Sequence, residues 1–295
     1  MAVPTDPDVR AAVLLEDRVK RVFRELPGAV AGHEEAVHQV RVAGRRLRVA
    51  LPLLARKGGR RPKVRALRVL RKLTRAVGQG RDMDVLLGLF EDRLANVRSP
   101  SAEQRALLSR LKAARARAKA QVAEDILDID IHGLRRSLRL LMRNGAAGAS
   151  TVLTRVDSLR EAEADELMRG FSHVGARYLP DALHALRRRI RRLRYAAEVE
   201  DLVRAEESRA PVLWKRLQDG IGVIHDHHVL ARWFDEQGRL ANARSSDLLA
   251  RAARRERRSF TGLGRLLHRA LLEAKPADVA LRALQAMARR RPIAS

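Results

Sequence analysis

The feature that most constrains the fold of this chain is a basic motif that occurs twice. His184, Arg187, Arg191 and Arg194 are spaced three, four and three residues apart. At about 100° per residue in a helix, this spacing places all four side chains on one narrow face. The first copy begins at His38, and both copies read H-x-x-R-x-x-x-R-R-L-R. The recurrence indicates an internal repeat of helical segments.

The repeat extends beyond the motif. Further positions match across the chain: Lys72-Leu73 with Arg216-Leu217, Gly78 with Gly222, Asp82 with Asp226, and Val85-Leu86 with Val229-Leu230. The small, Gly/Ala-rich stretch at 144–150 separates the two copies and is the best candidate boundary. The sequence therefore predicts two homologous helical halves, 8–146 and 147–290.

Nearly every segment has helical periodicity, and no stretch alternates with the period of two that a half-buried strand requires. Pro27-Gly28 predicts the end of the first helix, and Gly78-Gln79-Gly80 predicts a break in the third. The predicted helical segments are 8–26, 34–51, 60–77, 82–94, 102–122, 126–142, 153–178, 181–207, 211–217, 228–234, 247–272 and 277–290.

These segments predict an all-α fold. Each helix has an apolar face that must pack against another helix, so each half is expected to form a small antiparallel bundle. In the second copy of the motif, Leu186, Ile190 and Leu193 lie away from the basic stripe and are expected in the core. Two homologous bundles often assemble about a pseudo-twofold axis. The two His/Arg stripes would then face each other across a groove or pore.

The charge of the chain favours a polyanionic partner. Its 61 Lys and Arg residues exceed its 35 Asp and Glu residues, which gives a formal net charge of +26. A GC-rich genome accounts for an excess of Arg over Lys, but it does not account for basic residues arranged in stripes. Aromatic residues make up only 3% of the chain, and base-binding proteins usually stack bases on aromatic side chains. A polyanion without bases therefore fits better than a single-stranded nucleic acid.

Several other classes of site have little support in the sequence. The chain has no Cys, which excludes disulfides, thiolate metal sites and Cys nucleophiles. No apolar run is long enough to span a bilayer and the first residues do not resemble a signal peptide, so the expected location is cytoplasmic. His225 and His228, with Asp226 between them, leave a divalent-ion site open, but no third ligand is evident. We expect no metal, no cofactor and no catalytic residue.

Four segments resemble the CHAD family, the conserved histidine α-helical domain. They are VHQVRVAGRRLRVAL at 37–51, GQGRDMDVLL at 78–87, LHALRRRIRRLRYAAE at 183–198 and LQDGIGVIHD at 217–226. The resemblance implies two helical bundles related by pseudo-twofold symmetry around a basic pore, which binds inorganic polyphosphate, and it implies association with polyphosphate granules. Carried over by position, the implied ligands are His38, Arg41, Arg45, Arg48, His184, Arg187, Arg191, Arg194 and Tyr195.

The third helix adds a further basic stripe. Arg65, Arg68, Lys72 and Arg75 repeat the three-four-three spacing. At the equivalent positions the second half has Arg209, Val212, Arg216 and Asp219, of which we include Arg216 in the predicted site. The pore is therefore expected to be more positive on the side of the first half. The chain also departs from the family at His225-Asp226, where an Asn-Asp pair is usual.

The predicted function is the binding of polyphosphate. Each Arg offers a planar fork of donors that matches phosphoryl oxygens, and several stripes would hold a flexible polymer by charge alone. Two alternatives stay open: a nucleic-acid-binding or nucleoid-associated protein, and a metal-dependent enzyme acting on polyphosphate. The first lacks a recognisable DNA-binding motif, and the second lacks carboxylates or a nucleophile beside the stripes. Other phosphate-rich anions, chain-length preference, oligomeric state and cellular role are also open.

Overall fold

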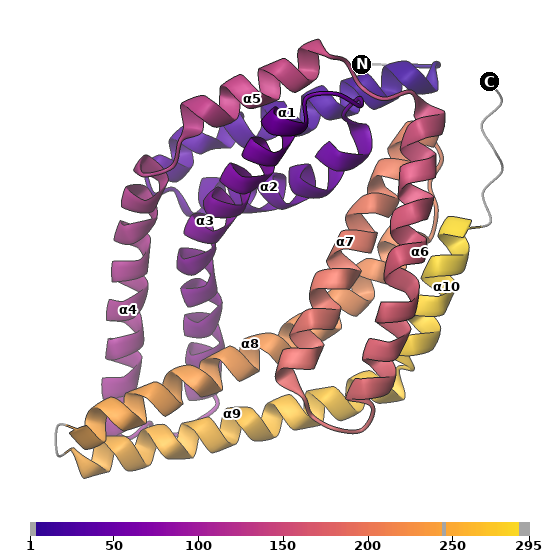
Figure 1. Ribbon diagram of the computed structural model, residues 1–295. Helices are drawn as coiled ribbons and strands as arrows, with labels where there is room; N and C mark the ends of the chain where they lie inside the picture. Colours follow the sequence, from indigo (N-terminus) through magenta and orange to yellow (C-terminus); the bar gives the residue numbers. More distant parts are fainter. Residues whose placement is uncertain (1–3, 244–245, 289–295) are drawn as a thin grey trace.

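The prediction of an all-α fold is confirmed. The computed structural model describes residues 4–243 and 246–288, and within these ranges the chain forms ten α-helices and no β-strand (Figure 1). The helices are α1 (Pro7–Val30), α2 (Glu34–Leu54), α3 (Arg60–Ala95), α4 (Ala102–Leu127), α5 (Ile131–Arg143), α6 (Ala149–Val174), α7 (Pro180–Arg204), α8 (Ala210–Ala243), α9 (Asp247–Glu273) and α10 (Pro276–Ala288).

Side-chain caps define several helix starts. Ser101 and Gln104 form a reciprocal capping box at the start of α4, which satisfies two backbone N–H groups that the first turn leaves free. Asp6 caps α1 and Asp130 caps α5 through a single hydrogen bond each, which the side chain accepts from the Asp8 and Gly133 amides, respectively. The Asp130 cap also explains why the turn between α4 and α5 lies at 128–130, a few residues later than the sequence predicts.

Helices at matching places in the two halves have similar lengths. The helices α3 and α8 contain 36 and 34 residues, and α5 and α10 contain 13 each. In Figure 1, α3 and α4 run side by side along one side of the molecule and α8 and α9 along another, so that the helices outline a ring. The internal duplication stays a prediction, with which these lengths agree.

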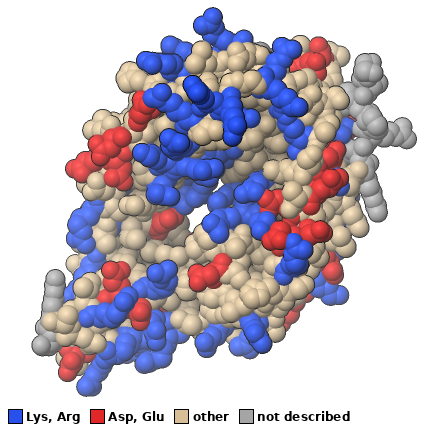
Figure 2. Space-filling view, viewed as in Figure 1, with Lys and Arg blue, Asp and Glu red and all other residues tan. Residues whose placement is uncertain are grey.

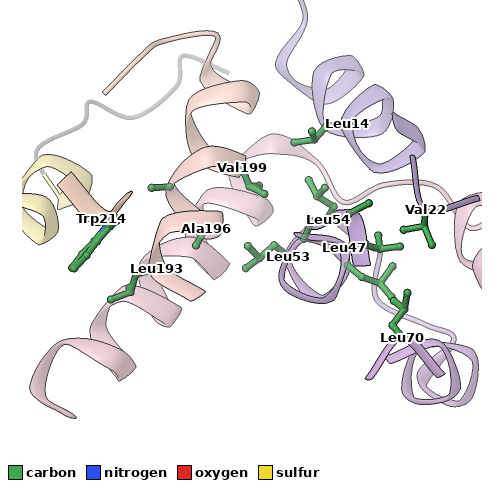
Figure 3. Close-up of a cluster of buried hydrophobic side chains, with 14 of the residues drawn as sticks. Leu14, Val22, Leu47, Leu53, Leu54, Leu70, Leu193, Ala196, Val199 and Trp214 are labelled. Atoms are coloured by element: carbon green, nitrogen blue, oxygen red, sulfur yellow. The ribbon is translucent and has the colours of Figure 1, made fainter. Parts of the chain in front are cut away.

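The two halves share one large hydrophobic core. Leu47 of α2, Leu70 of α3, Leu193 of α7 and Trp214 of α8 are all fully buried and belong to a single cluster (Figure 3). The 144–148 linker between the halves is also held in place, because Ala147 N donates a hydrogen bond to the Leu54 carbonyl at 2.7 Å. The division of the chain at 146–147 stays a prediction, but the packing joins the two parts closely.

A second, separate cluster joins the far ends of the longest helices. It includes Phe90 of α3, Leu107 of α4, Phe234 of α8 and Phe260 of α9. The rings of Phe90 and Phe234 meet edge to face with centroids 4.8 Å apart, an arrangement that aromatic pairs favour. The two halves are therefore joined by two hydrophobic clusters. The helix surfaces between the two clusters border the middle of the molecule.

The predicted break at Gly78-Gln79-Gly80 is wrong, because α3 runs unbroken through it. These glycines permit close packing. The guanidinium of Arg41 lies beside Gly78, and a Cβ on Gly80 would lie 3.2 Å from the Val122 side chain of α4. The segments 211–217 and 228–234 likewise belong to one continuous helix, α8.

Another helix end also differs from the prediction. Pro27-Gly28 does not end α1, which continues to Val30. Gly28 instead lets α1 approach α2, since a Cβ on it would lie 2.8 Å from the Cβ of Ala36. At the other end of the chain, residues 289 and 290 of the last predicted helix lie outside the described residues. Among the helices described, none combines the length and the hydropathy that crossing a bilayer requires.

Candidate functional site

A cleft rich in arginine lies between α2, α3, α6 and α7. Its volume is about 690 Å³, and we call it the arginine cleft. Seven arginines line it: Arg45 and Arg48 of α2, Arg71 of α3, and Arg188, Arg189, Arg191 and Arg192 of α7. The remaining lining residues are apolar side chains and Tyr195. Figure 2 shows the molecule hollowed at its middle, with Lys and Arg side chains around the hollow.

The two copies of the basic motif meet in this cleft. Arg45 and Arg191 occupy the same position of the motif in α2 and α7, and both line the cleft. The opposite faces of the two helices carry Leu47 and Leu193, which are fully buried in the shared core. Burial of the apolar faces therefore turns both basic faces toward the same space.

Two of the seven arginines have carboxylate partners. Glu163 of α6 is 5% exposed and pairs with Arg189 at 2.7 Å and with Arg192. The Arg48 guanidinium donates a hydrogen bond to the Thr74 hydroxyl at 3.2 Å. Within the described part of the chain, five cleft arginines have no carboxylate at ion-pair distance: Arg45, Arg48, Arg71, Arg188 and Arg191.

Burial and mutual repulsion act on three of these side chains. Burial, followed by the charges of Arg41 and Arg191, lowers the pKa of Arg45 to about 9. Burial also lowers the pKa of Arg191 to about 10, with Arg187 and Arg41 adding to the effect. The pKa of Arg48 is lowered by burial and by Arg71 and Arg192. The cleft thus holds positive charges at an energetic cost that a bound anion would relieve.

Tyr195 forms part of the wall of the cleft. Its side chain is buried, with 7% exposure. The guanidinium groups of Arg46 and Arg194 lie over its ring, 5.7 and 5.5 Å from the centroid. These contacts stabilise the two cations by the charge distribution of the ring. Of the predicted ligands, Arg45, Arg48, Arg191 and Tyr195 line the arginine cleft.

Arg41 and Arg187 lie outside the lining of the cleft and face the glycines of the neighbouring helices. Arg41 donates hydrogen bonds to the Gly78 carbonyl at 2.9 Å and to Asp82 at 2.8 Å. A Cβ on Gly222 would lie 3.1 Å from the Arg187 guanidinium. Each of the two arginines thus lies beside a glycine of the neighbouring helix, and at Gly222 a side chain would crowd the guanidinium group.

Arg194 is held by polar partners from its own half. It pairs with Glu198 at 3.1 Å and lies 3.5 Å from the Gln218 side-chain oxygen. Glu198 also accepts hydrogen bonds from Arg46 at 3.0 and 3.4 Å. The segment 184–194 contains no acidic residue, but Glu198 and Glu163 pair with its arginines from outside it.

The two motif histidines lie outside the lining of the cleft. His38 and His184 are half-buried, and the Nδ1 atom of each is buried with no hydrogen-bond partner. The His184 ring lies against that of His225, with centroids 4.4 Å apart. Burial lowers the pKa of His184, helped by nearby arginines. Burial and the His184 ring lower the pKa of His225 to about 4, so both rings are neutral at pH 7.

The predicted stripe of α3 faces a different cavity. Arg65, Arg68 and Lys72 line a cavity of about 870 Å³ beside the turn between α4 and α5, which we call the second basic cavity. Arg75 and Arg216 are exposed and line neither cavity. The structure therefore divides the predicted ligands among the arginine cleft, the second basic cavity, packed positions around them and the exposed surface.

Sequence reasoning missed four arginines of the cleft: Arg71, Arg188, Arg189 and Arg192. It selected one narrow face of each helix, whereas the cleft receives side chains from a wider sector of α7. For three of them the signal was present, because Arg188, Arg189 and Arg192 flank the chosen stripe in the run R-R-R-I-R-R. Arg71 lies beside Lys72 of the third-helix stripe. The sequence did not indicate Glu163, since its role depends on how α6 packs beside α7.

The described residues do not assemble a metal site. Within them, no three His, Asp or Glu side chains lie close enough together to hold an ion. His227 Nδ1 lies 2.8 Å from the Val223 carbonyl of its own helix, and its ring contacts Phe260. The histidines of the 225–228 segment therefore point to different neighbours.

Comparisons with known proteins agree with this fold. Residues 13–235 match the family model described as CHAD domain. A solved structure, the crystal structure of the CHAD domain from the plant Ricinus communis, superposes with a TM-score of 0.60 at 18% sequence identity, covering 99% of this chain and 94% of that one. A comparison with curated proteins gives no match.

Proposed function

The chain belongs to the CHAD domain family, which is associated with polyphosphate binding, and from this premise we propose that it binds inorganic polyphosphate in the arginine cleft. The observation that carries the proposal is the set of five cleft arginines without a carboxylate partner in the described structure. Three of them, Arg45, Arg48 and Arg191, have lowered pKa values because they are partly buried and, in addition, lie close to other positive charges.

A linear phosphate polymer suits this arrangement. Each phosphoryl group presents oxygens that an Arg fork can bind through two hydrogen bonds, and charge-assisted bonds of this kind are stronger than neutral ones. Because the cleft takes arginines from both motif copies, the polymer would contact α2 and α7 at once. Binding would replace repulsion between the arginines with attraction to phosphate.

The proposal treats the protein as a binding module and not as an enzyme. The residues that line the arginine cleft include no Asp, Glu, His, Ser or Thr. Phosphoryl transfer generally needs carboxylates that hold a metal ion, or a positioned nucleophile or base. The cleft lining offers donors for the charge of the polymer, and the nearby Glu163 carboxylate is already paired with Arg189 and Arg192.

Polyphosphate is a better candidate than nucleic acid. The aromatic residue in the cleft lining is Tyr195, and its ring is already covered by two guanidinium groups. Among the described residues, the cleft therefore offers no free aromatic face on which a base could stack. We also propose that the protein resides in the cytoplasm and associates there with polyphosphate granules. A fluorescent fusion would show whether it collects on them.

A titration with matched variants tests the proposal. Arg45→Ala/Arg191→Ala removes two cleft charges, and Arg265→Ala/Arg269→Ala removes two exposed charges from α9. Long-chain polyphosphate and duplex DNA would compete for each protein at about 0.15 M salt, where exposed charges are partly screened. We expect polyphosphate to displace DNA, and the cleft variant alone to lose most of the affinity. Equal losses in both variants would show that binding depends on diffuse surface charge.

A further inference from the structure

The second basic cavity differs from the arginine cleft in position and exposure. Its cationic lining comes from α3: Arg60, Arg61, Arg65, Arg68 and Lys72. All five side chains are exposed. They occupy one sector of the helix and extend over about 18 Å of it, at about 1.5 Å per residue.

The acidic residues of the cavity neutralise only part of this charge. Asp128 and Asp130, at the turn between α4 and α5, line the cavity with the five cations. Asp130 is already committed, because it pairs with Arg65 at 2.6 Å and accepts a hydrogen bond from the Gly133 amide of α5. These bonds lower the pKa of Asp130, with Arg65 as the largest cause. Among the described residues, no carboxylate is at ion-pair distance from Arg68 or Lys72.

The two cavities adjoin along α3. Arg71 lines the arginine cleft, whereas Arg68 and Lys72 line the second basic cavity. Residues three apart on a helix have Cβ atoms about 5–6 Å from each other. Arg71 and Arg68 are therefore close enough for one flexible polyanion to extend from the arginine cleft into the second basic cavity without crossing an uncharged stretch.

We propose that the second basic cavity is a separate phosphate subsite, which binds the part of a long polyphosphate chain that extends beyond the arginine cleft. The proposal rests on the proposed function and gives it a chain-length preference. A short oligophosphate occupies the cleft alone, while a long chain occupies both places. Once a long chain is bound in the arginine cleft, its contact with the second basic cavity is intramolecular. This contact therefore forms at a high effective concentration and increases the affinity, a gain that short ligands lack.

The test measures the affinity of three proteins for each of two ligands. Tripolyphosphate and long-chain polyphosphate would be titrated into the wild type, Arg68→Ala/Lys72→Ala, and the control Arg265→Ala/Arg269→Ala, at equal salt. All four substituted side chains are exposed, so the fold should persist, and circular dichroism would verify it. We expect Arg68→Ala/Lys72→Ala to weaken long-chain binding by about tenfold or more, given the size of typical linkage effects. Tripolyphosphate binding should change by less than about twofold, as expected if short chains leave this cavity empty.

Other results would overturn the inference. If Arg68→Ala/Lys72→Ala lowers the affinity for both ligands equally, the α3 side chains contact the ligand within a single site. If it changes long-chain binding no more than the α9 control does, the second cavity contributes only general charge. Either result would leave the arginine cleft itself intact. Failure of the proposed function would instead appear as polyphosphate binding that is insensitive to Arg45→Ala/Arg191→Ala.

Discussion

Neighbouring arginines of α2 should respond to the same substitution in opposite ways. Arg45 lines the arginine cleft, and its pKa falls from 12.5 to about 9 because burial and the charges of Arg41 and Arg191 oppose its positive charge. Arg46 points to the other half of the molecule, where it donates hydrogen bonds to Glu198 at 3.0 and 3.4 Å. Replacement by Met removes the charge from either side chain while keeping most of its apolar stem.

The lowered pKa of Arg45 sets the size of the expected change in stability for Arg45→Met. Each pKa unit corresponds to about 1.4 kcal/mol, so the charge of Arg45 costs the free folded protein on the order of 4–5 kcal/mol before water in the open cleft screens it. After screening, we expect Arg45→Met to raise the free energy of unfolding by about 1–2 kcal/mol. The same substitution should weaken polyphosphate binding by about tenfold, the value of one charged hydrogen bond. Arg46→Met should lower the free energy of unfolding by about 1–2 kcal/mol, because it breaks a partly buried ion pair between α2 and α7.

Urea denaturation measures these differences, using protein washed in high salt to remove bound polyanions. Titration with long-chain polyphosphate then gives the affinity of each variant. The reasoning predicts opposite signs for the stability and the affinity of Arg45→Met. It would be refuted if Arg45→Met destabilised the free protein as much as Arg46→Met does, because Arg45 would then serve the fold and not a ligand.

Three further predictions follow from local geometry. His225 has a folded-state pKa of about 4, compared with an ordinary value of 6.5. Between these pH values the unfolded chain binds more protons than the folded protein, so the free energy of unfolding should fall as the pH drops from about 6.5 to about 4. His225→Asn should flatten that part of a plot of stability against pH. Glu163→Gln should strengthen polyphosphate binding severalfold in a titration, because it frees Arg192 and leaves Arg189 with Glu166 as its remaining carboxylate partner, while lowering the melting temperature. Gly44→Ala should destabilise the protein by about 1–3 kcal/mol in urea, since the new Cβ would lie 2.6 Å from the Thr74 methyl group; an unchanged midpoint would show that α2 and α3 can move apart without cost.

The sequence predicted the features that depend on helical periodicity. The spacing of His184, Arg187, Arg191 and Arg194 placed a basic stripe opposite Leu193, and the structure buries Leu193 in the core. The all-α class follows from the same pattern, because no segment alternates with period two. The structure places Arg45, Arg48 and Arg191 in the lining of one cleft, and their role as phosphate ligands stays a prediction.

The features that sequence reasoning missed depend on how different helices pack together. Gly78 predicted a break in the helix when read alone, but in the fold α3 continues through it, and its carbonyl accepts a hydrogen bond from Arg41 of α2. The partners of Arg194 and Arg192 could not be inferred either, because Glu198 follows the stripe and Glu163 comes from α6. Periodicity tells which way a side chain points relative to its own helix, and it does not tell what the neighbouring helix places there.

Helical spacing also could not show that the basic stripe of the third helix lines a different cavity from the arginine cleft. Arg68 and Arg71 are three residues apart and would be assigned to one surface by spacing alone. In the structure they line different cavities, because the α4–α5 turn lies beside one and α7 beside the other. Only the arrangement of four helices shows that a polymer could contact both in succession.

A crystal structure of the protein with long-chain polyphosphate would test the central claim most directly. We expect phosphate groups within hydrogen-bond distance of the Arg45, Arg48 and Arg191 guanidinium groups, with the polymer lying between α2 and α7. Phosphate bound only on outer surfaces such as the exposed face of α9, with these three arginines unliganded, would contradict binding in the arginine cleft.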